Sequence, residues 1–177
     1  MAQNKNARHI MAGKGKLSML IRDVAAADAL QISAFLKELT AIGKRIRPDD
    51  EIFVLKNYIS DPEKICCFVA EEDGIILGFQ SLKKAVLGNQ WDVEPGWGII
   101  GTHINPVAAR RGVGRALFGV TVREARKSGL LYIDASIGTS NSEALAYYGA
   151  MGFQTYRTTQ GRICKRFDLG DAVSNPA

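Results

Sequence analysis

Residues 109–114 of the chain read ARRGVG, which combines arginines and glycines directly ahead of a helix-like run. The first amides of a helix lack hydrogen-bond partners and carry partial positive charge, so they attract anions. Gly112 and Gly114 would let an anion approach the backbone closely, while Arg110, Arg111 and Arg115 would add positive charge around it. The pattern predicts a site for paired phosphates on the backbone N–H groups of residues 110–115. The alternative is a plain strand-to-helix turn with solvated arginines.

A second stretch, NSEALAYYGAMGF at 141–153, could line the same ligand. Asn141 and Tyr148 are seven residues apart, about two helical turns, so they share one helix face. One face can line one elongated molecule. Taken singly, Asn141 would be a helix cap and Tyr148 a core aromatic with its hydroxyl satisfied nearby.

Two other phosphate motifs fit less well. The segment GKGKLS at 13–18 fails the spacing of a P-loop. A dinucleotide-binding fingerprint would need a third glycine at Leu117, although Asp134 imitates its acidic partner about twenty residues further on. This alternative is weakened because the chain contains one strand-helix-strand crossover rather than several.

Hydrophobic periodicity and turn residues predict the elements that position these residues. The first half of the chain is expected to form a strand within 19–24, a helix through Ile32 to Leu39, a second helix ending near Tyr58, and two strands joined by a hairpin at Asp73-Gly74. The second half is expected to form a strand at 97–105, a helix from Val113 to a cap at Gly129, a strand at 131–136, a helix from about 141 to Met151, and two closing strands. A right-handed crossover would make strands 97–105 and 131–136 parallel neighbours in a mixed sheet with helices on both faces.

The two motifs, in this order, resemble the GNAT acetyltransferase superfamily. The resemblance covers roughly residues 19–169 in element order and is sharpest over 97–153, where HINPVAARRGVGRAL is similar to the strand, proline and pyrophosphate loop of the family. Ala109 departs from the pattern, since the family usually has Gln or Arg there. We expect the change to weaken rather than abolish coenzyme binding, because such a loop acts mainly through backbone N–H groups.

The resemblance implies an α/β (α+β) fold whose mixed, mostly antiparallel sheet has about seven strands. The parallel pair, the fourth and fifth of these strands, would splay to admit acetyl-CoA as co-substrate, with no metal. Pantetheine would pair with the backbone near His103 and Ile104. The implied cofactor-binding residues are His103, Ile104, Arg110, Arg111, Gly112, Val113, Gly114, Arg115, Asn141 and Tyr148.

The resemblance also suggests catalytic roles. Tyr148 would be the general acid for the departing thiolate, and a backbone N–H near Ile104 would stabilise the oxyanion. Glu94 is the first candidate for the general base, with Asp92 beside it, although each could equally be a solvated loop charge. His103 titrates in a useful range, but its expected role is that of strand backbone.

The predicted activity is acetyl transfer from acetyl-CoA to a primary amine of a small molecule, by direct attack in a ternary complex. Acetylation of a protein N-terminus or lysine is the main rival. A module that binds acyl-CoA without catalysis is another. The resemblance further implies a homodimer, since dimers are frequent among relatives.

Length and charge fit this reading. The 177 residues suit one domain at 19–169, preceded by a flexible basic leader at 1–18 and followed by a disordered tail at 170–177. The formal charge is +5, but four positive residues and no acidic ones lie in the leader, which leaves +1 for the remainder. We therefore expect no nucleic-acid partner. No apolar run is long enough to cross a membrane, so no membrane association is expected.

The cysteines and histidines exclude other classes. Cys66, Cys67 and Cys164 form neither a disulfide framework nor a metal-ligand pattern, and the chain has two histidines. We expect no metal centre, and a reducing, cytoplasmic setting fits best.

Overall fold

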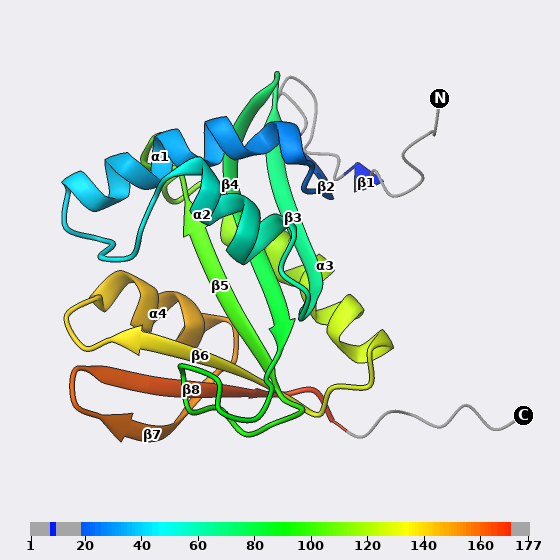
Figure 1. Cartoon of the computed structure of the whole chain (residues 1–177), viewed down its shortest axis with the longest axis vertical. Helices are drawn as coiled ribbons and strands as arrows, with labels where there is room; N and C mark the ends of the chain where they lie inside the picture. Colours follow the sequence, from blue (N-terminus) through cyan, green and yellow to red (C-terminus); the bar gives the residue numbers. More distant parts are fainter. Residues whose placement is uncertain (1–7, 10–18, 171–177) are drawn as a thin grey trace, which may run out of the picture.

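The structure is a computed structural model that describes residues 8–9 and 19–170 (Figure 1). A single mixed sheet has the strand order β1-β2-β3-β4-β5-β6-β8-β7. The strands are β1 (Arg8–His9), β2 (Leu20–Asp23), β3 (Lys64–Glu72), β4 (Ile75–Lys84), β5 (Gly98–Ile104), β6 (Tyr132–Gly138), β7 (Gln154–Thr159) and β8 (Arg162–Asp168). The α-helices are α1 (Ala29–Ala41), α2 (Glu51–Val54), α3 (Val113–Lys127) and α4 (Ser142–Ala150), and the shorter helical turns are η1 (Ala26–Asp28), η2 (Leu55–Ile59) and η3 (Pro106–Ala108).

The predicted α+β fold with a mixed, mostly antiparallel sheet is confirmed. Among the described residues β5 and β6 form the one parallel pair, and every other neighbouring pair is antiparallel. The sheet has one strand more than expected, because β1 lies within the predicted leader and pairs with β2. The rest of that leader, and the tail from 171 onward, lie outside the described residues.

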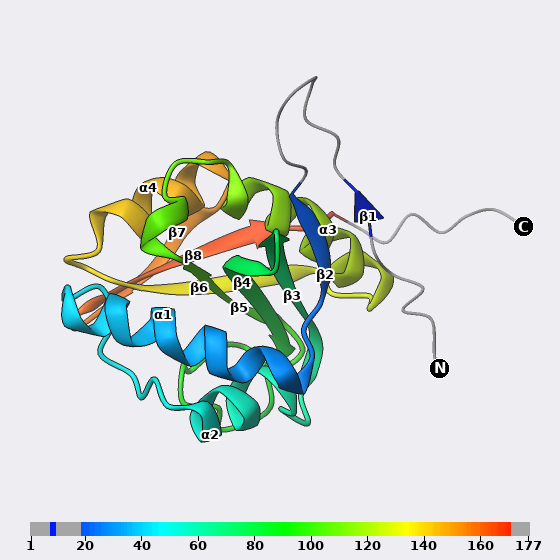
Figure 2. The same cartoon turned by 90° about the horizontal axis from the view of Figure 1, so that it is seen from above.

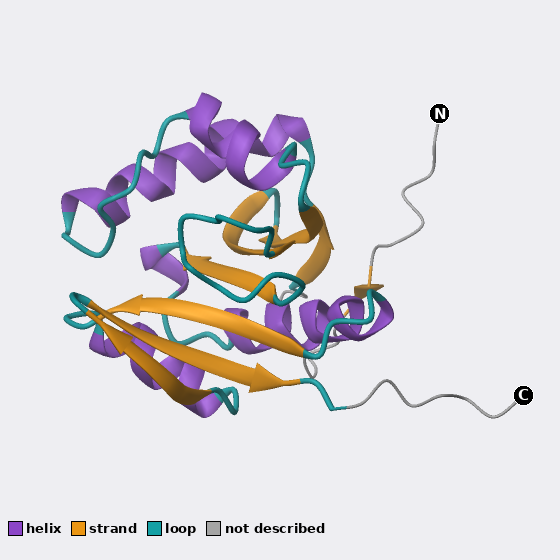
Figure 3. Cartoon of the chain, turned by 60° about the horizontal axis from the view of Figure 1, so that its bottom comes forward, coloured by secondary structure: helices purple, strands orange, loops and turns teal. Residues whose placement is uncertain are grey.

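Helices cover both faces of the sheet, as Figures 2 and 3 show. On one face α3 and α4 pack through Leu117 and Tyr148 against the side chains of β3 to β6. On the other face α1 and the α2–η2 segment pack through Ile32 and Tyr58 against β3 and β4. Two apolar layers therefore hold the sheet between them.

Local signals account for the elements nearest the gap between β5 and β6. Asp73 and Gly74 both have positive φ, 51° and 78°, as the two central residues of a tight hairpin turn require, so the predicted hairpin of β3 and β4 is confirmed. The expected second helix is split in two. Asp50 caps the four-residue α2 by accepting from the Phe53 amide, and a π-helical turn, η2, then carries the chain to Ile59.

Candidate active site

The parallel strands β5 and β6 pair over a very short distance. Their register joins Gly98 with Ile133 and Ile99 with Asp134. β5 then continues to Ile104 and β6 to Gly138, and the two strands diverge toward their carboxyl ends (Figure 1). The facing edges of these strands leave backbone N–H and C=O groups available to a ligand.

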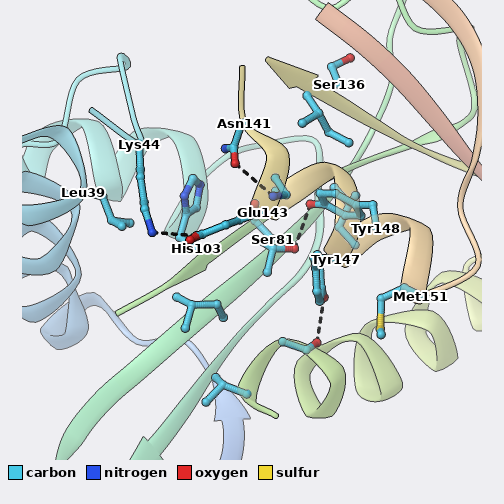
Figure 4. A pocket seen from close by; sticks show the side chains of 18 of the residues that line it. Leu39, Lys44, Ser81, His103, Ser136, Asn141, Glu143, Tyr147, Tyr148 and Met151 are labelled. Atoms are coloured by element: carbon cyan, nitrogen blue, oxygen red, sulfur yellow. Dashed lines mark hydrogen bonds and ion pairs between the residues drawn. The ribbon is translucent and has the colours of Figure 1, made fainter. Parts of the chain in front are cut away.

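A cavity of about 820 Å³ opens at this gap. Its walls come from both faces of the sheet: Tyr148 of α4 lies on one side and Tyr58 of η2 on the other, with β5 and β6 between them. Figure 4 shows the labelled side chains that line it. Of the site residues expected from sequence, the cavity brings together His103, Ile104, Arg110, Gly112, Val113, Gly114, Arg115, Asn141 and Tyr148.

The loop that precedes α3 exposes the start of the helix. Arg110 and Gly112 both have positive φ, 62° and 78°, and Gly112 is the N-cap of α3. None of the described side chains caps the first amides of the helix. The first N–H groups of a helix have no partner within the helix, and a bound anion could accept their hydrogen bonds.

Gly114 serves a purpose that the sequence did not reveal. A Cβ atom at this position would lie 2.7 Å from Cε2 of Tyr147, closer than real Cβ atoms approach. The Tyr147 hydroxyl also donates a hydrogen bond to the Gly114 carbonyl oxygen, at 2.8 Å. Gly114 is therefore required by the tyrosine that packs on it, whereas a Cβ at Gly112 would meet nothing within 4 Å.

The three arginines around the start of α3 differ in their surroundings. Arg110 and Arg115 line the cavity. Arg111 does not; its guanidinium forms an ion pair with Glu72, with 2.6 Å between Nη2 and Oε2. The structure thus assigns the side chain of Arg111 to a contact with β3 rather than to the cavity.

Tyr148 lies where β5 and β6 separate. The residue is 6% exposed, and its hydroxyl is 2.9 Å from the Thr102 hydroxyl of β5. Burial raises the pKa of Tyr148 above its ordinary value, and the neighbouring Tyr147 adds to the effect. The hydroxyl is therefore protonated throughout the physiological pH range.

A chain of hydrogen bonds links Tyr148 to the start of α3. The fully buried Gln80 donates from Nε2 to the hydroxyls of Thr102, at 2.8 Å, and Tyr147, at 3.1 Å. Tyr147 in turn donates to Gly114. Sequence reasoning missed Gln80, Thr102 and Tyr147. The one signal for Tyr147 was its position beside Tyr148 in the motif.

Asn141 both caps α4 and borders the cavity. Its Oδ1 accepts from the Ala144 amide at 3.0 Å, which leaves its side-chain NH₂ group for a ligand. Two residues further on, Glu143 forms an ion pair with Lys44 at 2.7 Å (Figure 4). This exposed pair joins α4 to the segment between α1 and α2 at the rim of the cavity.

His103 points toward the face covered by α1 and α2. Its ring lies against Phe79, with 4.8 Å between centroids, and its Nε2 is 3.4 Å from the Tyr58 hydroxyl. Burial, together with the nearby charges of Arg45 and Arg47, lowers the pKa of His103 to about 3. The imidazole is therefore neutral at physiological pH.

The carboxylates expected near the base position lie elsewhere. Glu94 is exposed in the loop between β4 and β5 and does not line the cavity. Asp92 is also exposed, and it forms an ion pair with Arg157 at 2.7 Å. The structure gives no support to Glu94 as the base, because its side chain is exposed and lies outside the cavity lining, although Trp91 of the same loop does line the cavity.

Within the described ranges 8–9 and 19–170, no group of three or more His, Cys, Asp or Glu residues is arranged to hold a metal ion. No helix among these residues has the length and apolar character needed to cross a membrane.

Comparison with solved structures identifies similar folds. The GNAT domain of PAT from S. lividans has 15% sequence identity and a TM-score of 0.73, covering 92% of this chain and 96% of that one. The structure of yncA from Salmonella typhimurium, which contains its cofactor acetyl-CoA, has 20% identity and a TM-score of 0.70, covering 90% of this chain and 98% of that one. A ribosomal-protein-alanine N-acetyltransferase from Brucella melitensis has 19% identity and a TM-score of 0.68, covering 84% of this chain and 98% of that one.

The sequence itself was compared with curated proteins and with family models. The curated proteins gave no match. The model of the acetyltransferase (GNAT) family matches residues 32–153, more than half of the chain and a range that contains the gap, the α3 loop and Tyr148. This chain therefore belongs to the GNAT acetyltransferase family.

Proposed function

We propose that this acetyltransferase moves the acetyl group of acetyl-CoA to a primary amine of a small molecule, by direct attack in a ternary complex. One observation carries the proposal: a single cavity contains the uncapped start of α3, the open edges of β5 and β6, and the buried hydroxyl of Tyr148. The proposed anion site, the strand edges and the proposed proton donor thus line one cavity.

The residues fit the coenzyme. The amides of Gly112 to Arg115 would hold the diphosphate, with Arg110 and Arg115 supplying positive charge. The β5 edge near His103 and Ile104 would pair with pantetheine, and the Asn141 amide would donate to it. Bound there, the coenzyme supplies an activated thioester. Ala109, which replaces the usual polar residue of the family, contributes its backbone alone.

Tyr148 is the proposed general acid. Negative charge develops first on the carbonyl oxygen, where a backbone N–H of β5 near Ile104 would stabilise it. As the carbon–sulfur bond breaks, the charge passes to sulfur. Because the pKa of Tyr148 is raised by burial, its hydroxyl keeps its proton until that moment and can donate it to the thiolate. The amine nitrogen loses one proton as the amide forms, and this proton would restore the tyrosine hydroxyl, so that the products are the amide and the free thiol of CoA.

The attacking amine must be neutral, although the pKa of an alkylammonium is about 10.4. Two acidic residues of the cavity lining, Asp61 and Glu143, are each held in an ion pair with a lysine that also lines it. We propose that the remaining positive charge of the lining, together with desolvation, disfavours the ammonium form, so that the amine reacts without a carboxylate base. Glu94 has no part in this scheme.

The alternatives concern the acceptor and the assembly. A protein N-terminus or lysine remains the rival acceptor, and a module that binds acyl-CoA without catalysis the rival function. A homodimer and a cytoplasmic location belong to the proposal too. The second is supported by the three cysteines, which are buried and free.

Replacement of Tyr148 by Phe tests the proposed mechanism. We expect kcat for acetyl-CoA-dependent thiol release with amine acceptors to fall about a hundredfold or more, because the proton donor is lost. The Kd of acetyl-CoA, measured by calorimetry, should change little, since the ring and its packing remain.

Tyr132→Phe is the matched control, because Tyr132 is a half-buried tyrosine of β6 outside the cavity lining. Its kcat should equal that of the wild type. Unchanged turnover in Tyr148→Phe would remove the general-acid role. A wild-type protein that binds acetyl-CoA but releases no thiol with any amine would favour the non-catalytic alternative.

A further inference from the structure

Arg47 lies between two aromatic rings at the cavity wall. It belongs to the segment between α1 and α2, and its guanidinium carbon is 5.0 Å from the ring centroid of Phe53 and 5.1 Å from that of Trp91. The residue is half-buried and lines the cavity. Stacking of this kind fixes the plane of the guanidinium but leaves its N–H donors unused.

Arg47 has no acidic partner in the part of the chain that the structure describes. Within residues 19–170 its guanidinium makes no hydrogen bond or ion pair, and its pKa is lowered first by burial. The charge of Arg45 lowers the pKa further. A half-buried, unpaired cation of this kind is costly, and an anion beside it would relieve the cost.

Arg45 adds a second positive charge behind the first. It is 7% exposed, and its Nη2 donates to the Pro48 carbonyl at 2.7 Å and to the Tyr58 hydroxyl at 3.2 Å. Its Nε is buried and has no partner among the described residues. Among the described residues the hydrogen bonds of Arg45 thus end on neutral oxygens, and its guanidinium also lies over the Phe53 ring, so this end of the cavity is positive.

The other charged residues of the lining do not change that sign. Asp61 is paired with Lys83 at 3.0 Å, and Glu143 with Lys44 at 2.7 Å. Lys64, whose Nζ donates to the Ile59 carbonyl oxygen, adds a further cation. A polyamine would be repelled here, whereas an anion would find Arg47 with free donors.

We propose that Arg47 binds an anionic group, a carboxylate or a phosphonate, carried by the acceptor amine itself. The inference rests on the proposed acetyl transfer and names its substrate class: small amines that also bear an anion. The planar guanidinium can meet both oxygens of such a group at once. Arg110 and Arg115, by contrast, lie in the loop before α3 and in the first turn of α3, and this helix packs on the opposite face of the sheet.

The same anion would act on His103. The positive charges of Arg45 and Arg47 help to keep the imidazole neutral, and a bound carboxylate would cancel part of their effect. His103, which is in contact with the Tyr58 hydroxyl, would then accept a proton more readily. Only a substrate with the anionic group would prepare the site in this way.

The test compares ω-amino acids of increasing chain length with their neutral primary amides. For wild-type protein we expect the best acid to have a KM at least about tenfold below that of its amide, as a charge-assisted bidentate pair would give. In Arg47→Gln the KM of that acid should rise about tenfold to a hundredfold, with the KM of the amide and of acetyl-CoA unchanged. Arg47→Lys keeps the positive charge but not the planar guanidinium, so its KM for that acid should lie between the values of the wild type and of Arg47→Gln.

Arg162→Gln is the matched control. Arg162 also stacks on Trp91, at 5.2 Å, but it does not line the cavity, so the preference for acids should persist. Equal KM values for acids and amides in the wild type, or an equal loss for both in Arg47→Gln, would overturn the inference. So would a loss confined to acetyl-CoA, which would assign Arg47 to the coenzyme.

Calorimetry separates this inference from the proposed function. Protein saturated with CoA is titrated with the same acids and amides, so that the diphosphate site is filled. Tighter binding of acids than of amides, lost in Arg47→Gln, would support the inference. If no acceptor were turned over in that case, only the proposed acetyl transfer would be contradicted. Absence of any acid binding would contradict the inference while leaving acetyl transfer intact.

Discussion

Gly114 and Tyr147 fit together at the start of α3 so closely that a single added methyl group should be felt. In Gly114→Ala the new Cβ would meet the Tyr147 ring at 2.7 Å, so the ring or the loop must shift. We expect the free energy of unfolding to fall by about 1–3 kcal/mol, the usual cost of overpacking. Affinity for acetyl-CoA should fall as well, because the loop amides would move. Thermal unfolding and calorimetry measure the two effects.

Gly119→Ala in the same helix is the control. Gly119 is exposed, and a Cβ there meets nothing within 4 Å. Alanine should therefore stabilise the helix by about 0.5–1 kcal/mol. If both variants were stabilised alike, the close contact between Gly114 and Tyr147 would not exist in solution.

At the residue scale, the sequence predicted those site residues whose place depends on local backbone conformation or on the spacing of a motif. Gly112 was expected at the loop, and its positive φ at the N-cap of α3 agrees with that expectation. Arg47 and Gln80 could not be found in this way, because their roles depend on contacts with Trp91 and Tyr147, which are distant in the sequence. Arg111 shows the same limit: nothing near it in sequence indicates that Glu72 lies within reach.

At the scale of elements, the open edges of β5 and β6 should respond to the coenzyme. Beyond Ile99 neither strand has the other as a partner, so amides on these edges face the cavity rather than a neighbouring strand. We expect hydrogen exchange in residues 100–104 and 135–138 to slow when CoA is added, with little change in the β3–β4 hairpin. Mass spectrometry of exchanged peptides measures this. Equal protection in both regions would argue against a ligand within the gap.

The elements themselves were largely predictable, because strong local signals mark their limits. Asp73-Gly74 and the proline after β5 are such signals, and both agree with the structure. The start of α4 also agrees with its local signal, since Asn141 is the N-cap of the helix. The partner of Glu143 in the first turn could not be predicted in this way, because Lys44 is distant in the sequence.

For the whole molecule, His103 should make stability depend on pH. Its pKa is lowered to about 3 in the folded protein but has the ordinary value of about 6.5 in the unfolded chain. Between these values the unfolded chain binds one proton more, so the free energy of unfolding falls as the pH is lowered from about 6.5 toward 3. His103→Phe should therefore lose less stability than the wild type over that range. Urea unfolding at several pH values measures the difference.

The interval between about pH 5 and 6.5 is the most informative one, since histidine titrates there. Asp134, whose pKa is raised by burial, contributes with the opposite sign, but it does so in both proteins and cancels from the comparison. His9 is likewise common to both. Parallel curves for wild type and His103→Phe would contradict the shifted pKa.

The short pairing of β5 with β6 has a consequence for the architecture. Two register pairs join one half of the sheet to the other, and beyond them β5 and β6 separate and leave a gap. A coenzyme bound in this gap would act as a removable ninth strand between the two halves. The co-substrate would then also be part of the sheet, so any substitution that widens the gap would lower both the rigidity of the sheet and the rate of acetyl transfer.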